Sequence, residues 1–142
     1  LGIAFVFIII GSFFSDLQNY YPRYKVTHGL SFANHHNVST WVPILIYEAS
    51  YATSFITVEF LFRGFLIYAF IKYFGSYSIL PMVATYCFLH FGKPATETLS
   101  SIIGGYILGI IALKNRNIWG GVMVHVGVAW SMELFGYLQT RF

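Results

Sequence analysis

The chain has 142 residues, of which 57% are hydrophobic and only 9% are charged, and its net charge is +3 at pH 7. A soluble domain carries about 25% charged residues, so this composition excludes an ordinary water-soluble globule and predicts an integral membrane protein. The positive charge is small and scattered, which excludes a nucleic-acid-binding protein. The single cysteine, Cys87, excludes an internal disulfide and any multi-cysteine metal site.

The N-terminal part of the chain begins with the apolar segment LGIAFVFIIIG. Its first residue is leucine, and it lacks the charged start of a signal peptide. We therefore expect a fragment of a longer chain, truncated at its N-terminus, with a partial membrane helix over residues 1–15. Residues 16–40 are polar and predict a loop that lies outside the hydrocarbon or lines a protein-covered cavity. The remainder, 43–139, forms the core of a single membrane-embedded domain over 1–142.

A long apolar segment follows from Pro43 to Gly75 without a clear break. Roughly 33 residues make about 50 Å of helix, whereas the hydrocarbon core of a bilayer is about 30 Å thick. We therefore expect a strongly tilted helix, a helix that protrudes from the membrane, or two helices.

The remaining apolar segments complete an all-α, polytopic membrane helix bundle of about five segments. Ile79 to His90 is too short to cross a bilayer and predicts a half-helix that ends at a polar turn facing a cavity. The next helix is expected over Thr98 to Leu113 and the last over Ile118 to Gln139. The former carries small residues every four positions, which allow a neighbouring helix to approach closely: Ser101, Gly105 and Gly109.

Charged residues inside these segments are candidates for function, because a charge at the bilayer centre costs about 3 kcal/mol or more. Glu59 and Arg63 are one helical turn apart and can pair on one face. A buried pair that only neutralises itself would usually be replaced by apolar residues without loss of stability. Lys93 and Glu97 are also four apart, and they can pair with each other or with the first two.

Two histidines, His90 and His125, also lie in or beside the apolar segments. If they are packing residues, His90 caps a helix end and His125 is satisfied in the core. If they converge with Glu59 and Arg63, the set suits hydrolysis inside a membrane. A carboxylate beside a histidine can deprotonate water, a second histidine can bind an oxyanion, and the arginine keeps the carboxylate ionised. The carboxylate and the two imidazoles can also hold zinc with one open position, although the chemistry does not require a metal.

Three stretches carry a family resemblance: VEFLFRGF, YCFLHFGKP and IWGGVMVHVGVAWSME. They resemble the three motifs of the CPBP intramembrane proteases, which include type II CAAX prenyl endopeptidases, bacteriocin-processing proteins and abortive-infection proteins. The HFGKP block is typical of a variant branch. The resemblance implies an endopeptidase that acts at the lipid bilayer on a peptide or a lipid-modified protein. It also implies a multi-pass protein of the bacterial inner membrane.

The resemblance assigns roles residue by residue. Glu59 matches the second glutamate of the first motif and Arg63 its arginine. The second motif pairs an aromatic with a histidine, here Tyr86 and His90, and the histidine helps to hold the attacking water. His125 matches the histidine on the oxyanion side. We therefore expect Glu59 to activate water beside His90.

Two positions depart from the family pattern. Val58 stands where the family has its first glutamate, which is taken to be the base, and Ala129 stands where the third motif has Asn or Asp. Three alternatives follow. Glu59 acts as the base, or Glu97 is recruited to help, or the chain is a catalytically inactive membrane binding protein on the same scaffold, as in bacteriocin immunity.

Overall fold

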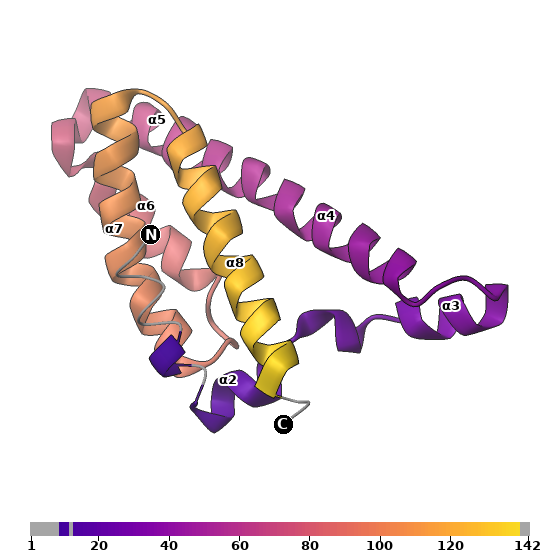
Figure 1. The fold of residues 1–142 in the computed structure, drawn as a ribbon. Helices are drawn as coiled ribbons and strands as arrows, with labels where there is room; N and C mark the ends of the chain where they lie inside the picture. The colour runs from indigo at the N-terminus through magenta and orange to yellow at the C-terminus, as the bar shows by residue number, and fades with distance from the viewer. Residues whose placement is uncertain (1–8, 12, 140–142) are drawn as a thin grey trace. The chain divides into compact units, whose positions relative to one another are not determined.

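The fold is known from a computed structural model that describes residues 9–11 and 13–139 (Figure 1). These residues form helices and connecting turns, with no strand among them, which confirms the predicted all-α class. Three helical runs in this part of the chain are long and apolar enough to cross a membrane: Trp41–Phe88, Ala95–Asn115 and Trp119–Gln139. The partial helix expected over 1–15 lies largely outside the described residues.

The chain divides into two compact units. Among the described residues, one unit contains those up to Ser54 and from Val126 onward, and the other contains residues 55–125. All the ionisable residues that the sequence singles out as site candidates lie in the second unit.

The unit 55–125 begins in the last turn and a half of α4 (Trp41–Glu59). Helix α4 continues without a break into the π-helical turns η2 (Phe60–Leu66) and then into α5 (Ile67–Phe74). The long segment is therefore one continuous helical run with a widened stretch in it. Helix α5 ends at Gly75, whose φ of +56° is a conformation that glycine adopts at little cost.

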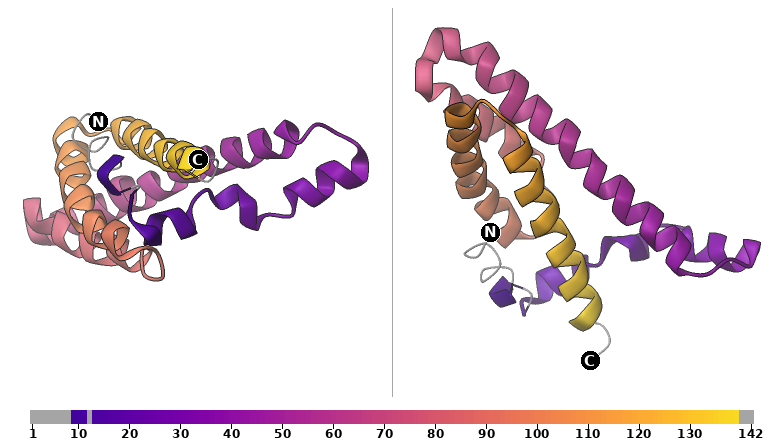
Figure 2. Two further views of the ribbon diagram at one scale, coloured as in Figure 1. Left: turned by 60° about the horizontal axis from the view of Figure 1, so that its bottom comes forward. Right: turned by 45° about the horizontal axis from the view of Figure 1, so that its top comes forward.

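The expected half-helix is present as α6 (Ile79–Phe88), which follows the 3-10 turn η3 (Gly75–Ser78). Its 10 residues span about 15 Å, too little to cross a bilayer. Helix α7 (Ala95–Asn115) packs along α6 (Figures 1 and 2). A Cβ on Gly109 of α7 would lie 2.9 Å from Ile79 Cγ2, so the close approach predicted from the small residues is confirmed.

The apolar core of this unit joins η2, α5 and α6 and comprises Phe62, Ile67, Ile79, Met82, Val83 and Tyr86. Val58 packs against this core, together with two residues of α7. The outer face of α7 is apolar and open, with Leu99 and Ile103 each 66% exposed. An apolar face of this kind suits contact with acyl chains.

The other unit contains the part of the chain that was expected to be a polar loop. Residues 16–40 instead form mostly short helices, namely α2 (Ser15–Tyr20), η1 (Arg23–Val26) and α3 (Gly29–His36). The polar composition therefore predicted the surface character of this stretch and missed its local helices. In these helices the backbone N–H and C=O groups form hydrogen bonds within the chain. Such bonds are needed beside lipid, because lipid offers no hydrogen-bonding partner.

Contacts with the second half of α8 (Trp119–Gln139) hold the N-terminal stretch of this unit. The backbone N–H of Arg23 donates to both carboxylate oxygens of Glu133, at 2.8 and 2.9 Å. A Cβ on Gly136 would lie 2.7 Å from Tyr21 Cβ, so only glycine permits this approach. Glu133 thus has a structural partner in its own unit.

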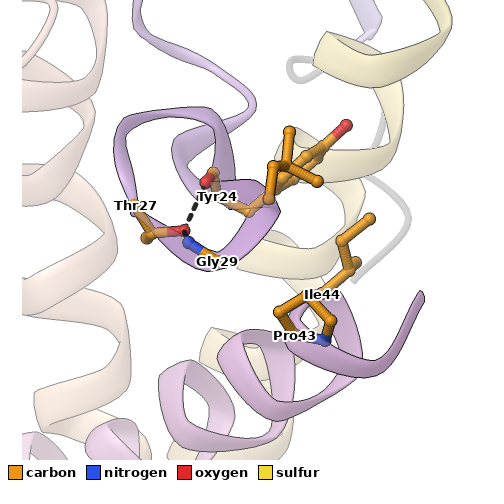
Figure 3. A pocket seen from close by; sticks show the side chains of 6 residues that line it. Tyr24, Thr27, Gly29, Pro43 and Ile44 are labelled. Carbon is orange, nitrogen blue, oxygen red and sulfur yellow. Dashed lines mark hydrogen bonds between the residues drawn. The ribbon is translucent and has the colours of Figure 1, made fainter. Parts of the chain in front are cut away.

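A shallow pocket lies in the same unit, between the turn after η1 and the start of α4 (Figure 3). Thr27 Oγ1 donates to the carbonyl oxygen of Tyr24 at 2.7 Å on one side, and Pro43 and Ile44 form the other side. The pocket has no room for a water-sized molecule, so it offers no binding site as it stands.

Candidate active site

Glu59 and Arg63 form a fully buried ion pair, with Glu59 Oε1 3.1 Å from Arg63 Nη1. Glu59 is the last residue of α4 and Arg63 lies in η2, so the pairing predicted from their spacing is present. Its π-helical setting is notable, because such widened turns occur frequently at functional sites. Two charges taken out of water need each other, since either one alone would be strongly destabilising.

The same carboxylate oxygen binds a histidine from another helix. Glu59 Oε1 is 2.8 Å from Nδ1 of His125, in the first half of α8. An ionised carboxylate can only accept, so Nδ1 carries a proton, and in the neutral imidazole Nε2 is then an acceptor. Nε2 lies 2.7 Å from the hydroxyl oxygen of Tyr86, which therefore donates to it. Glu59, His125 and Tyr86 thus form a continuous hydrogen-bonded chain.

Two neighbours fix where this chain meets α8. Gly121 lies one turn before His125, and a Cβ there would overlap Glu59 Oε2 and lie 2.8 Å from Glu59 Cδ. Glycine at this position therefore makes room for the carboxylate. The ring of Phe55 stacks on His125 with the centroids 4.7 Å apart and the planes at 20°. The imidazole is held both by its hydrogen bonds and by an aromatic face.

Tyr86, at the end of α6, is buried at the centre of the cluster. The guanidinium carbon of Arg63 lies 4.1 Å from its ring centroid, and Phe62 meets the ring edge-on at 5.3 Å. A Cβ on Gly105 of α7 would lie only 3.0 Å from Tyr86 Cδ1, so the ring fits closely against that helix. Sequence reasoning treated Tyr86 only as the aromatic of a motif. Tyrosines are common in the apolar segments of this chain, so its sequence offered no signal that singled Tyr86 out.

His90 lies in the turn after α6, one turn beyond Tyr86, and is buried. Its Nδ1 is 3.3 Å from the carbonyl oxygen of Tyr86, which can only accept, so the unprotonated nitrogen is Nε2. The two rings are neighbours, with centroids 4.8 Å apart. Within the described part of the chain no hydrogen bond or ion pair joins His90 to Glu59. The structure pairs Glu59 with His125, and the water shared by Glu59 and His90 stays a prediction.

Burial lowers the pKa of His90 below its ordinary value of 6.5, and the positive charge of Lys93 lowers it further. Because the pKa of the folded protein is below that of the unfolded chain, the unfolded chain takes up this proton first as the pH falls. His90 therefore favours folding fully above about pH 6.5, and this contribution is lost as the pH decreases from there through the folded pKa.

This linkage predicts a difference between two histidine variants. We expect His90→Gln to reduce the loss of thermal stability between pH 7.5 and pH 5 relative to the wild type. The exposed His28 offers a matched control, since His28→Gln should leave that loss unchanged. Thermal unfolding of both variants in detergent micelles measures the effect, and an identical pH dependence for His90→Gln and wild type would contradict it.

Glu97 begins α7 and pairs with Lys93, with Nζ 2.7 Å from Oε1. Of the two pairings that the spacing allowed, the structure thus contains the one within the turn. Next to it, Thr98 Oγ1 donates to the carbonyl oxygen of His90 at 2.7 Å and ties this turn to α7. Glu97 therefore stands beside the turn that carries His90.

The zinc set considered from the sequence, Glu59 with His90 and His125, is not assembled. Among residues 9–11 and 13–139, no three His, Cys, Asp or Glu side chains are grouped so that they can hold a metal ion. The donor set therefore does not fit a zinc ion, and the chemistry of the cluster rests on its own side chains.

The cluster retains unused hydrogen-bonding capacity. In the described part of the chain, Glu59 Oε2 is buried without a hydrogen-bond partner, whereas Arg63 Nη1 faces Glu59 Oε1 at 3.1 Å. A buried carboxylate oxygen of this kind is uncommon in folded proteins and can accept a hydrogen bond from a water molecule or a ligand. An ion pair, an oriented histidine and a free carboxylate oxygen at one buried point have the composition of a hydrolytic site.

Comparison with known proteins agrees with this composition. A family described as type II CAAX prenyl endopeptidase, Rce1-like, matches residues 40–131. The match covers more than half of the chain, so the chain belongs to this family, as the resemblance predicted. No curated protein and no solved structure matches the chain. The helices long enough to cross a bilayer and the family together make it an integral membrane protein with the fold of an intramembrane protease.

Proposed function

We propose that this chain is an endopeptidase that hydrolyses peptide bonds of membrane-associated substrates. One observation carries the proposal: Glu59, Arg63, Tyr86 and His125 meet at a buried point with one carboxylate oxygen unpartnered. Membership of an endopeptidase family supports it independently. A cluster built only for packing would not need an ionised carboxylate with an unsatisfied oxygen.

In the proposed reaction, Glu59 Oε2 accepts a proton from a water molecule that Nε2 of His90 helps to hold. The water oxygen then bonds to the carbonyl carbon of the substrate, and the negative charge that develops on the carbonyl oxygen is stabilised on the side of His125. The C–N bond breaks, and the proton held by Glu59 goes to the leaving amine. Arg63 holds the Glu59 carboxylate in place through their ion pair.

The substrate class follows from the family and from the surroundings of the site. The family description names a CAAX prenyl endopeptidase. A peptide that carries a prenyl group near its C-terminus is therefore the first substrate to test. The open apolar face of α7 is a suitable surface for lipid. We place the protein in a lipid bilayer. That this bilayer is a bacterial inner membrane stays a prediction.

A cleavage assay tests the proposal. The probe is an internally quenched peptide with a farnesylated cysteine followed by three residues, presented in liposomes that contain the purified protein. We expect Glu59→Gln and His90→Ala each to reduce kcat/KM about a thousandfold, because one removes the base and the other removes a group that holds the water. Glu48→Gln on the same helix α4 is the matched control and should retain activity.

The assay also decides between the acids. Glu97→Gln is expected to leave cleavage close to wild type, whereas a loss as large as that of Glu59→Gln would assign the base to both carboxylates. Equal cleavage by wild type, Glu59→Gln and His90→Ala would reject the proposed site.

A binding protein without catalysis is the second candidate, and Val58 favours it. Where the family has its first glutamate, this side chain packs against the apolar core instead of presenting a carboxylate. Restoration tests this candidate with the same peptide. If Val58→Glu combined with Ala129→Asn creates cleavage that the parent lacks, while the parent binds the peptide by fluorescence anisotropy, the parent is a binding protein.

A further inference from the structure

We propose that the hydroxyl group of Tyr86 donates a hydrogen bond to the substrate's carbonyl oxygen during hydrolysis, in the role left open by Ala129. This inference rests on the proposed function and adds a residue to its site. The family pattern has Asn or Asp one turn after His125 on α8, as a second group beside the oxyanion. In this chain that residue is Ala129, whose methyl group cannot donate a hydrogen bond.

The hydrogen-bonded chain shows how the hydroxyl becomes available. With neutral His125, the Tyr86 hydroxyl donates to Nε2 at 2.7 Å, and Nδ1 donates to Glu59 at 2.8 Å. When His125 takes up a second proton from solvent before the substrate binds, Nε2 becomes a donor and the phenolic oxygen becomes its acceptor. The hydroxyl proton then rotates away from the imidazole and can be donated elsewhere. Protonation at His125 thus releases a donor at Tyr86 without moving either ring.

One positive charge lies beside the Tyr86 ring, and protonation of His125 adds a second. The guanidinium group of Arg63 lies 4.1 Å from the ring centroid of Tyr86, and a protonated His125 adds a second charge at hydrogen-bond distance. Charge placed beforehand around a developing oxyanion is the largest single source of catalysis in many hydrolases. The site therefore combines a hydroxyl donor with cations on two sides of it.

The ring of Tyr86 is also held in place, as a preorganised donor requires. Gly105 leaves a gap on α7 into which the ring fits, and Phe62 closes its edge. His90 follows one turn later on the same short segment, with its ring 4.8 Å from that of Tyr86. The group proposed to hold the water and the proposed hydroxyl donor therefore belong to the same short segment, one helical turn apart.

The phenylalanine variant separates this role from a structural one. Tyr86→Phe keeps the ring and its contacts with Arg63 and Phe62 but removes the hydroxyl. In the farnesylated-peptide assay we expect kcat to fall about 100-fold to 1,000-fold, as for the loss of an oxyanion donor, with KM nearly unchanged. The thermal unfolding midpoint should fall only modestly, because a single hydrogen bond to His125 is lost. The exposed Tyr77 provides the control, since Tyr77→Phe should change neither constant.

A double variant tests whether Tyr86 takes the role that Asn or Asp has at position 129 in the family. Adding Ala129→Asn to Tyr86→Phe should restore kcat at least tenfold, because the new amide can supply the missing donor. Active wild type with an equally active Tyr86→Phe variant would overturn the role of Tyr86 and leave the proposed function intact. A loss that appears only in KM or in the unfolding midpoint would assign Tyr86 a structural role and also overturn the inference. Absence of cleavage by the wild type itself would reject the proposed function and this inference together.

Discussion

Replacing Gly121 by alanine is expected to abolish peptide cleavage, whereas the same replacement at Gly120 is expected to leave it unchanged. The added methyl group at 121 would overlap the carboxylate of Glu59. That carboxylate is fully buried and is held by Arg63 and His125, so it cannot move aside without breaking both contacts. The loss should match or exceed the thousandfold loss expected for Glu59→Gln.

Gly120 is a closely matched control because it is the adjacent residue on the same helix and has no atom within 4 Å of an added Cβ. Alanine there should be neutral or stabilise the helix by about 0.5–1 kcal/mol. Overpacking at 121 should instead lower the free energy of unfolding by about 1–3 kcal/mol. Both quantities can be measured on the two purified variants, and equal cleavage by Gly121→Ala and Gly120→Ala would show that the carboxylate does not work where the structure places it.

Removal of Arg63 is expected to give the largest loss of stability of any single substitution in the site. Arg63→Met leaves the buried charge of Glu59 without its ion-pair partner, which costs about 3–5 kcal/mol when one member of a buried pair is removed. The loss also removes the cation beside Tyr86. We therefore expect both lower stability and lower activity.

The double variant Glu59→Gln with Arg63→Met distinguishes an uncompensated charge from lost packing. It should recover most of the stability of the single Arg63→Met variant while remaining inactive, because no buried charge is left unpaired. Lys93→Met is the control for an ordinary ion pair, since Lys93 and Glu97 are partly exposed and such pairs contribute about 1 kcal/mol or less. Denaturant titration in mixed micelles measures all three. A double variant as unstable as Arg63→Met alone would show that packing, and not charge, dominates.

Features that depend on one helix were predictable from the sequence. The four-residue spacing of Glu59 and Arg63 fixes their positions on a helix surface, and the pair forms as expected. The short segment from Ile79 predicted a helix too short to cross a bilayer, and the small residues of α7 predicted that α7 packs closely on α6. These predictions follow from the rise and repeat of a helix, which the sequence alone determines.

Features that depend on how helices meet were not predictable in the same way. Glu59 contacts His125 because the packing of the helices decides which imidazole the carboxylate reaches. Tyr86 joins the cluster for the same reason. The short helices in 16–40 were missed because polar composition indicates exposure and says little about local hydrogen bonding.

The pairing of Glu59 with Arg63 has a consequence for how the protein enters its membrane. Both partners belong to a single helical run, one turn apart, so opposite charges can meet without help from the rest of the bundle. A nascent segment with this arrangement presents a neutral pair to the translocation machinery, although it carries two ionised groups. Tyr86 and His125 then need only pack against a Glu59 that is already paired with Arg63. The site can therefore assemble late, after its most polar part has entered the membrane.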